Sequence, residues 1–66
     1  MTGAELRTIR TRLRLTQEEL GTRLGVRKNT VWRWETEMRH IPEPVARLVP
    51  YLAKEVKTER KKPKKP

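Results

Sequence analysis

The sequence predicts an all-α fold, and three observations support that prediction. Apolar residues recur at intervals of three and four in short segments, as one face of a helix requires. Two Thr-x-x-Glu segments match the capping box that starts a helix. No segment alternates apolar and polar residues for long enough to predict a strand. A chain of 66 residues has room for one small domain.

The two capping boxes, Thr2–Glu5 and Thr16–Glu19, predict where the first two helices begin. The first helix is expected to run to about Arg14. The second is expected to end at Gly25, because glycine adopts a positive φ at little cost. The apolar faces of these two helices are formed by Leu6, Ile9 and Leu13, and by Leu20 and Leu24.

A third helix is expected over residues 28–36, followed by a connector over residues 37–42. Pro44 suits the first turn of a fourth helix. Pro50 lies inside that helix, where it removes a donor and crowds the carbonyl of Ala46, so we expect a kink or a break. The expected inward residues of these two helices are Val31 and Trp34, and Val45, Leu48, Val49 and Leu52.

The positive charge is concentrated at the C-terminal end. The formal net charge is +9, and residues 57–66 hold six bases against one acid. This tail has no apolar side chain except its prolines, so we expect it to be disordered. The sequence therefore predicts a folded domain over residues 1–56 and a basic tail over residues 57–66 that contacts a polyanion.

Several classes of function are disfavoured by composition. The chain has no cysteine, which leaves no disulfide framework and no thiolate zinc site. No apolar run is long enough to span a membrane, and Met1–Arg14 lacks the apolar core of a secretory signal. One histidine and no glycine-rich loop offer no catalytic constellation. We therefore expect a protein without enzymatic activity, cofactor, metal or small-molecule ligand.

The segment from Leu15 to Glu35 contains Leu-Thr-Gln-Glu-Glu-Leu, then Leu-Gly-Val, then Thr-Val-x-x-Trp-Glu. It resembles the helix-turn-helix of the lambdoid phage repressor and Cro family, and the xenobiotic-response-element-type regulators of bacteria. The resemblance covers roughly residues 4–52. It implies a compact bundle of four or five helices that binds duplex DNA through the major groove.

The residues support this interpretation independently. Gly21 has no side chain to hold the second and third helices apart, and the apolar positions fix their crossing. Helical geometry then turns outward a set of residues that is largely basic. Their side chains could pair with guanine or adenine edges. A solvated helix face is the plain alternative for these cations, and Trp32 could touch a thymine methyl, pack on a sugar or cover a neighbouring helix. The predicted base-reading residues are Arg27, Lys28, Asn29, Trp32 and Arg33.

Phosphate contacts are expected at two other places. Thr16 and Gln17 stand at the start of the second helix, where unpaired N–H groups and the helix dipole favour an anion. The resemblance implies a backbone contact for Gln17 and a phosphate contact for Arg39 and His40. It also implies a buried or half-buried ion pair joining Arg10 to Glu35.

The expected function is sequence-specific binding of double-stranded DNA by a small transcriptional regulator, a repressor acting at an operator in the cytoplasm of a bacterial or phage-infected cell. Two alternatives are an antitoxin-like or polymerase-binding interaction module and a non-specific nucleic-acid-binding protein. A homodimer, at least on DNA, is expected because one reading helix covers few base pairs. Its surface would come from Val49, Tyr51, Leu52 and Val56, unless these residues pack internally.

Overall fold

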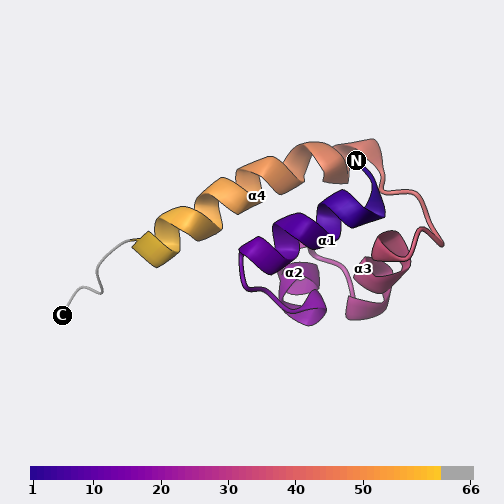
Figure 1. Cartoon of the computed structure of the whole chain (residues 1–66), viewed down its shortest axis with the longest axis horizontal. Helices are drawn as coiled ribbons and strands as arrows, with labels where there is room; N and C mark the ends of the chain where they lie inside the picture. The colour runs from indigo at the N-terminus through magenta and orange to yellow at the C-terminus, as the bar shows by residue number, and fades with distance from the viewer. Residues whose placement is uncertain (62–66) are drawn as a thin grey trace.

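The computed structural model describes residues 1–61, in which there are four α-helices and no strand. The helices are α1 (Gly3–Arg12), α2 (Gln17–Leu24), α3 (Lys28–Glu35) and α4 (Glu43–Lys61). The all-α prediction is confirmed. Helices α1, α2 and α3 cluster together, and α4 passes along one side of them and extends beyond them (Figure 1). No helix within residues 1–61 is long and apolar enough to cross a membrane.

Both predicted capping boxes are present and start α1 and α2. The Thr2 hydroxyl accepts from the Glu5 N–H at 3.1 Å, and the Glu5 carboxylate accepts from the Thr2 N–H at 2.8 Å. Thr16 and Glu19 repeat the arrangement at 3.0 and 2.8 Å. Helix α1 ends at Arg12, slightly earlier than predicted, and Arg14 then turns the chain with a φ of 58°.

The turn between α2 and α3 depends on two glycines. Gly25 ends α2 with a φ of 77°, and the Val26 N–H donates to the Gly21 carbonyl at 2.8 Å. This six-to-one bond is typical of a Schellman cap. A Cβ on Gly21 would lie 2.6 Å from the Val26 carbonyl oxygen. The predicted close approach at Gly21 is therefore present, and its partner is the backbone of the turn.

The core is a single apolar cluster to which all four helices contribute. Its most deeply buried side chains include Leu6, Val31 and Val49, each at most 1% exposed. The prediction that Leu48 faces inward is wrong, because its side chain is 46% exposed. Val56 lies inward instead and is 1% exposed, which removes it from any surface for a partner. The buried cluster is Leu6, Leu13, Leu15, Leu20, Val31, Trp34, Val49, Leu52 and Val56.

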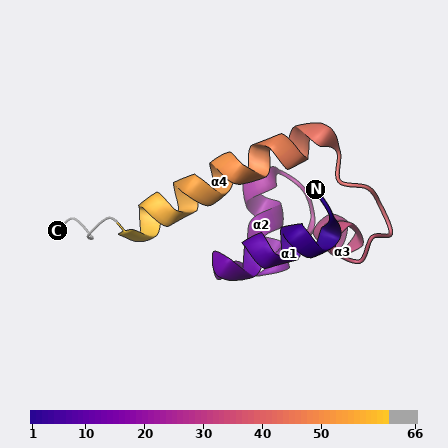
Figure 2. The ribbon, with the colours of Figure 1, turned by 45° about the horizontal axis from the view of Figure 1, so that its top comes forward.

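Helix α4 is continuous through Pro50, so the break allowed for at that position does not occur. Pro50 is exposed, which leaves water free to satisfy the carbonyl that loses its donor. The helix also continues past residue 56 to Lys61, so residues 57–61 are helical rather than disordered. Residues 62–66 of the predicted tail lie outside the described residues. The part of α4 that projects beyond the other helices is visible in both orientations (Figures 1 and 2).

Candidate nucleic-acid interface

The outer side of α3 presents the five side chains that sequence periodicity turned outward. All five are exposed, and Val31 and Trp34 on the opposite side are 0% and 5% exposed. Arg27 precedes the helix as its N-cap and makes no side-chain capping bond, so its guanidinium is not held at the helix end. We call this set the α3 face: Arg27, Lys28, Asn29, Trp32 and Arg33.

The N-terminal half of the α3 face borders a shallow groove between α2 and α3. Arg27, Lys28 and Asn29 line one side of this groove. Glu18 and Thr22 of α2 line the other side. The groove places three hydrogen-bonding side chains of the α3 face around one depression, and Glu18 adds an acceptor that the sequence had not singled out.

The loop after α3 contributes basic side chains beside the C-terminal half of the α3 face. Arg39 and His40 are exposed and line a shallow depression together with Arg33. Thr30 and Pro42 complete part of its wall. The structure therefore brings both loop residues predicted to contact phosphate next to a residue predicted to contact a base.

The two predicted phosphate residues at the start of α2 already have structural roles. The Thr16 hydroxyl accepts the capping bond from Glu19, and a hydroxyl that accepts one bond can still donate another. The Gln17 amide donates from Nε2 to Glu35 Oε1 at 3.1 Å. Gln17 thus ties the N-terminus of α2 to the last turn of α3, while the N–H groups of the first turn of α2 lack intrahelical partners.

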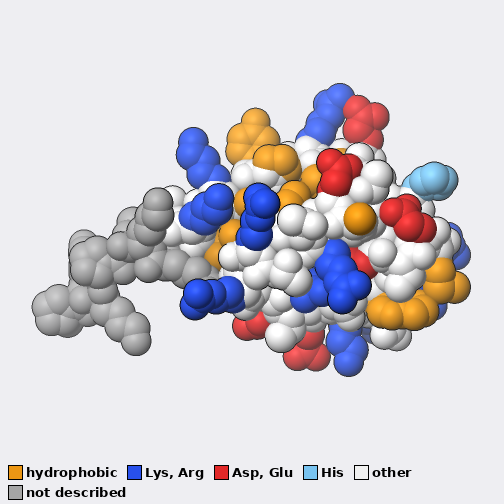
Figure 3. Space-filling model, viewed as in Figure 1, with side chains coloured by type: hydrophobic (Ala, Val, Ile, Leu, Met, Phe, Trp, Pro, Cys, Tyr) orange, Lys and Arg blue, Asp and Glu red, His pale blue; other side chains and the backbone are white. Residues whose placement is uncertain are grey.

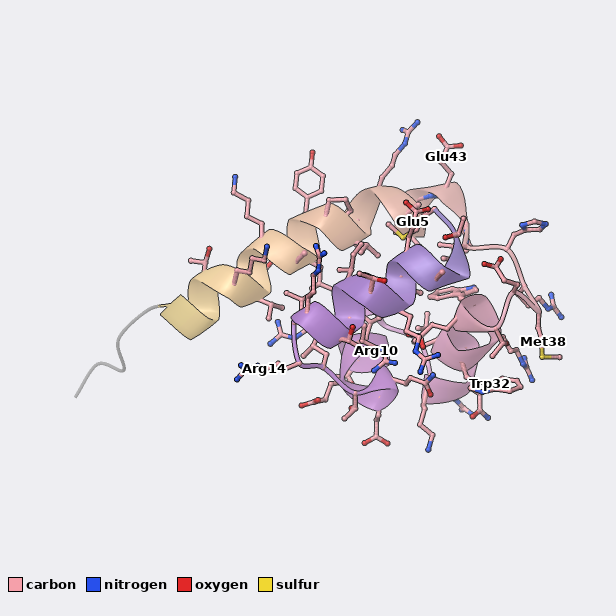
Figure 4. The ribbon with its side chains drawn as sticks, in the orientation of Figure 1. Glu5, Arg10, Arg14, Trp32, Met38 and Glu43 are labelled. Carbon is pink, nitrogen blue, oxygen red and sulfur yellow. The ribbon has the colours of Figure 1, made fainter. Side chains whose placement is uncertain are left out.

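A charged network fixes α3 against the rest of the domain. Arg10 donates from Nε to Glu35 Oε2 at 2.6 Å and from Nη2 to Glu35 Oε1 at 3.1 Å. The remaining nitrogen, Nη1, donates to the Leu15 carbonyl at 2.9 Å. The two side chains are 13% and 4% exposed, which confirms the predicted pair. Figure 4 shows Arg10 and, at the other side of α3, Trp32.

The N-terminus of α1 holds the C-terminal end of α3. The Gly3 N–H donates to Glu37 Oε2 at 2.6 Å, and a Cβ on Gly3 would collide with the backbone carbonyls of Trp34 and Glu35. Glu37 itself has a φ of 64°, in the left-handed region where glycine is usual. This contact orients the loop that carries Arg39 and His40.

Three residues of this region were missed in the sequence. Glu18 has the pattern of an ordinary helix-start acid, and its place in the groove depends on how α2 crosses α3. Glu37 stands where a glycine is usual in the connector, but its contact with Gly3 left no signal, since Gly3 is far away in sequence. Met38 is 64% exposed, and an apolar residue within a polar connector could have drawn attention to it.

No group of three or more His, Cys, Asp or Glu side chains within residues 1–61 could hold a metal ion. The side chains that converge at the α3 face are instead three cations, one amide and one indole. That combination suits hydrogen bonding to nucleic acid.

The comparisons with known proteins give one positive result. A family model described as a helix-turn-helix domain matches residues 2–53. The matched segment contains α1, α2, α3 and the first half of α4, with the whole α3 face and the network around Glu35. No curated protein and no solved structure matches the chain.

Proposed function

Since the chain belongs to the helix-turn-helix domain family, we propose that it is a small transcriptional regulator that binds double-stranded DNA sequence-specifically. Its α3 lies in the major groove. The observation that carries this proposal is the α3 face, where three cations, an amide and an indole are exposed while the opposite side of the helix is buried. The net charge of +9 favours association with a polyanion.

Base recognition is assigned to the side chains of the α3 face. Arg27, Lys28 and Arg33 can donate to O6 and N7 of guanine, and Asn29 can pair with N6 and N7 of adenine. The half-buried network of Arg10 and Glu35 supports this role, because base readout requires a helix held in one orientation.

Phosphate contacts are assigned to residues on either side of α3. Thr16, Gln17 and the first N–H groups of α2 approach the backbone on one side. Arg39 and His40 approach it beside the C-terminal half of α3. Such contacts set the register of the protein on the duplex and contribute affinity without sequence preference.

Regulation of transcription follows from occupancy of the DNA site by the protein. We assign the protein the role of a repressor that blocks transcription by covering its operator, in the cytoplasm of a bacterial or phage-infected cell. The two depressions beside α3 are shallow and are lined mainly by polar and charged side chains. This favours control through protein concentration over control by a small effector.

A homodimer on DNA completes the proposal. Leu48 and Tyr51 lie one helical turn apart on α4 and are 46% and 73% exposed. They replace the buried Val49, Leu52 and Val56 as the candidate contact. Two copies would place their α3 helices in half-sites about one turn of DNA apart, roughly 34–36 Å. Sedimentation with and without the selected duplex measures this state, and Tyr51→Ala is expected to weaken dimer formation.

Selection of bound fragments from random duplex DNA tests the central proposal. We expect one short sequence to be enriched, in two copies related by two-fold symmetry. Arg33→Ala should change the enriched sequence, whereas Arg47→Ala removes a cation from α4 and should leave it unchanged. Equal recovery of all sequences at moderate salt would contradict sequence-specific binding and would favour a non-specific, charge-driven binder.

A further inference from the structure

Trp32 differs in chemistry from every other residue of the α3 face. Its side chain is 46% exposed, whereas Trp34, two positions along the chain, is 5% exposed and belongs to the core. The remaining members of the face end in a cation or an amide, whereas Trp32 ends in a large apolar ring with a single N–H donor. A large indole left half in water is an apolar surface available for contact with a partner.

Met38 adds a second apolar side chain at the same end of α3. It is 64% exposed, and its N–H donates to the Arg33 carbonyl at 2.9 Å, which holds its backbone against the last turn of the helix. Figure 4 labels both Trp32 and Met38 at this end of the molecule. The space-filling view from the same side shows hydrophobic surface there (Figure 3).

Helical spacing places Trp32 among the residues assigned to base contact. It follows Lys28 by four positions and Asn29 by three, so the three side chains are neighbours on one face. If Lys28 and Asn29 reach the floor of the major groove, the indole faces the same floor. An apolar ring placed over polar base edges would leave them without partners, which is unfavourable.

The floor of the major groove has one apolar feature, the C5-methyl group of thymine. We therefore propose that Trp32 recognises a thymine methyl group in the binding site and that Met38 shields this contact from water. The inference rests on the proposed function and adds a base identity to it. The thymine lies beside the base pairs contacted by Lys28 and Asn29, so the preferred sequence contains a thymine whose methyl, rather than its O4, is recognised.

Replacement of thymine by deoxyuridine in the selected duplex is the direct test. The substitution removes only the methyl group and keeps the O4 acceptor and the base pairing. Deoxyuridine at the contacted position should weaken binding of the wild-type protein about fourfold, which is the effect of exposing roughly one CH₂ equivalent. Deoxyuridine at other thymines of the same site should have little effect and serves as the internal control.

Three variants assign the effect to this surface. Trp32→Ala should weaken binding and abolish the difference between thymine and deoxyuridine, whereas Trp32→Phe should retain it because an aromatic face remains. Met38→Ala should reduce the difference without abolishing it. Both side chains are exposed, so these variants should fold, and circular dichroism checks that they do.

The outcomes separate this inference from the proposed function. An enriched sequence whose thymines can all be replaced by deoxyuridine without loss would overturn the methyl contact and leave specific DNA binding intact. A Trp32→Ala protein that still distinguishes thymine from deoxyuridine would also overturn it. The same holds if Trp32→Ala weakens binding to specific and random DNA equally, because that result indicates packing on a sugar. Absence of any enriched sequence would overturn both proposals.

Discussion

Arg10 and Glu35 form a two-point ion pair at 2.6 and 3.1 Å that joins the last turn of α1 to the last residue of α3. Because Glu35 also accepts from Gln17, one carboxylate connects three helices. The pair is enclosed, with side chains 13% and 4% exposed. The orientation of the α3 face is thus set by a polar network as well as by apolar packing.

Removal of one partner of this network should be costly. Arg10→Met leaves the Glu35 carboxylate buried without its cation, and the expected loss is about 3–5 kcal/mol. Since a domain of this size has a total stability of roughly 3–10 kcal/mol, the variant should be largely unfolded on warming. Urea unfolding followed by circular dichroism measures the free energy.

The exposed pair of Arg47 and Glu43 provides the matched control. It is an i, i+4 pair on α4 with side chains 77% and 73% exposed. Arg47→Ala should change the free energy of unfolding by no more than about 0.5 kcal/mol. Similar losses in the free energy of unfolding for Arg10→Met and Arg47→Ala would show that the inner pair does not stabilise the fold as described.

Gly3→Ala should destabilise the protein although alanine favours helices. The added Cβ would meet the Trp34 carbonyl and lie 2.7 Å from the Glu35 carbonyl oxygen, and backbone atoms cannot move aside cheaply. Overpacking of this kind costs about 1–3 kcal/mol. Thermal unfolding of Gly3→Ala is compared with that of Gly25→Ala. The comparison separates steric collision from backbone strain, since Gly25 has open space around it and only a positive φ. A Gly3→Ala protein as stable as wild type would contradict the close contact.

The Glu5 cap should make stability depend on pH in the acid range. The Thr2 N–H that donates to its carboxylate lowers the pKa of Glu5 below its ordinary value of 4.5. A group whose pKa is lower in the folded state stabilises that state above the unfolded pKa, and this contribution is lost as the pH falls through the folded value. The stability advantage of wild type over Glu5→Gln should therefore be largest near neutrality and shrink below pH 4.5.

Thr2→Ala supplies the control for this prediction. The backbone and side-chain hydrogen bonds that lower the pKa of Glu5 are both made with Thr2. In a Thr2→Ala background the side-chain part of the box is absent, so the pH-dependent effect of the Glu5→Gln substitution should become smaller. An effect of Glu5→Gln that is independent of pH in both backgrounds would argue against the cap as its source.

The starts of α1 and α2 and the end of α2 could be predicted from the sequence because capping is local. Thr2, Thr16 and Gly25 act on residues within one turn, and each has its expected conformation. The outward side of α3 was predictable for the same reason, since the helical period alone separates Trp32 from Trp34. Local chemistry therefore decided most element boundaries and the composition of the α3 face.

The burial of α4 was predicted only in part. Val49, Leu52 and Val56 are spaced at i, i+3 and i+7 and are buried, and the same period separates them from Leu48, which is exposed. How α4 lies against the other helices is set by tertiary contacts, which a local pattern does not record. Two further contacts are likewise tertiary and cannot be predicted from a local pattern. They are the hydrogen bond from Gly3 to Glu37 and the position of Arg39 beside Arg33.

Arg33 and Arg39 should respond differently to substitution although both are exposed cations beside α3. Arg33→Ala should cost about 1–3 kcal/mol on the selected duplex and little on random DNA, because a base contact is lost. Arg39→Ala should weaken binding to all duplexes alike and reduce the slope of log K against log salt by about 0.9. Titrations at several salt concentrations measure both quantities. Uniform weakening by Arg33→Ala would contradict base contact.

Residues 62–66 should contribute to affinity through charge alone. They carry Lys62, Lys64 and Lys65 and no acid. Each phosphate that they neutralise contributes about 0.9 to the slope of log K against log salt, so deleting them should reduce the slope and weaken binding to every sequence equally. Substitution of the three lysines by glutamine keeps the chain length and should have the same effect. The comparison separates the effect of charge from the effect of removing the segment. Since α4 extends to Lys61 and Val56 is buried, the cut belongs after residue 61, where the helical core is preserved. An unchanged slope in both variants would show that this segment does not contact DNA.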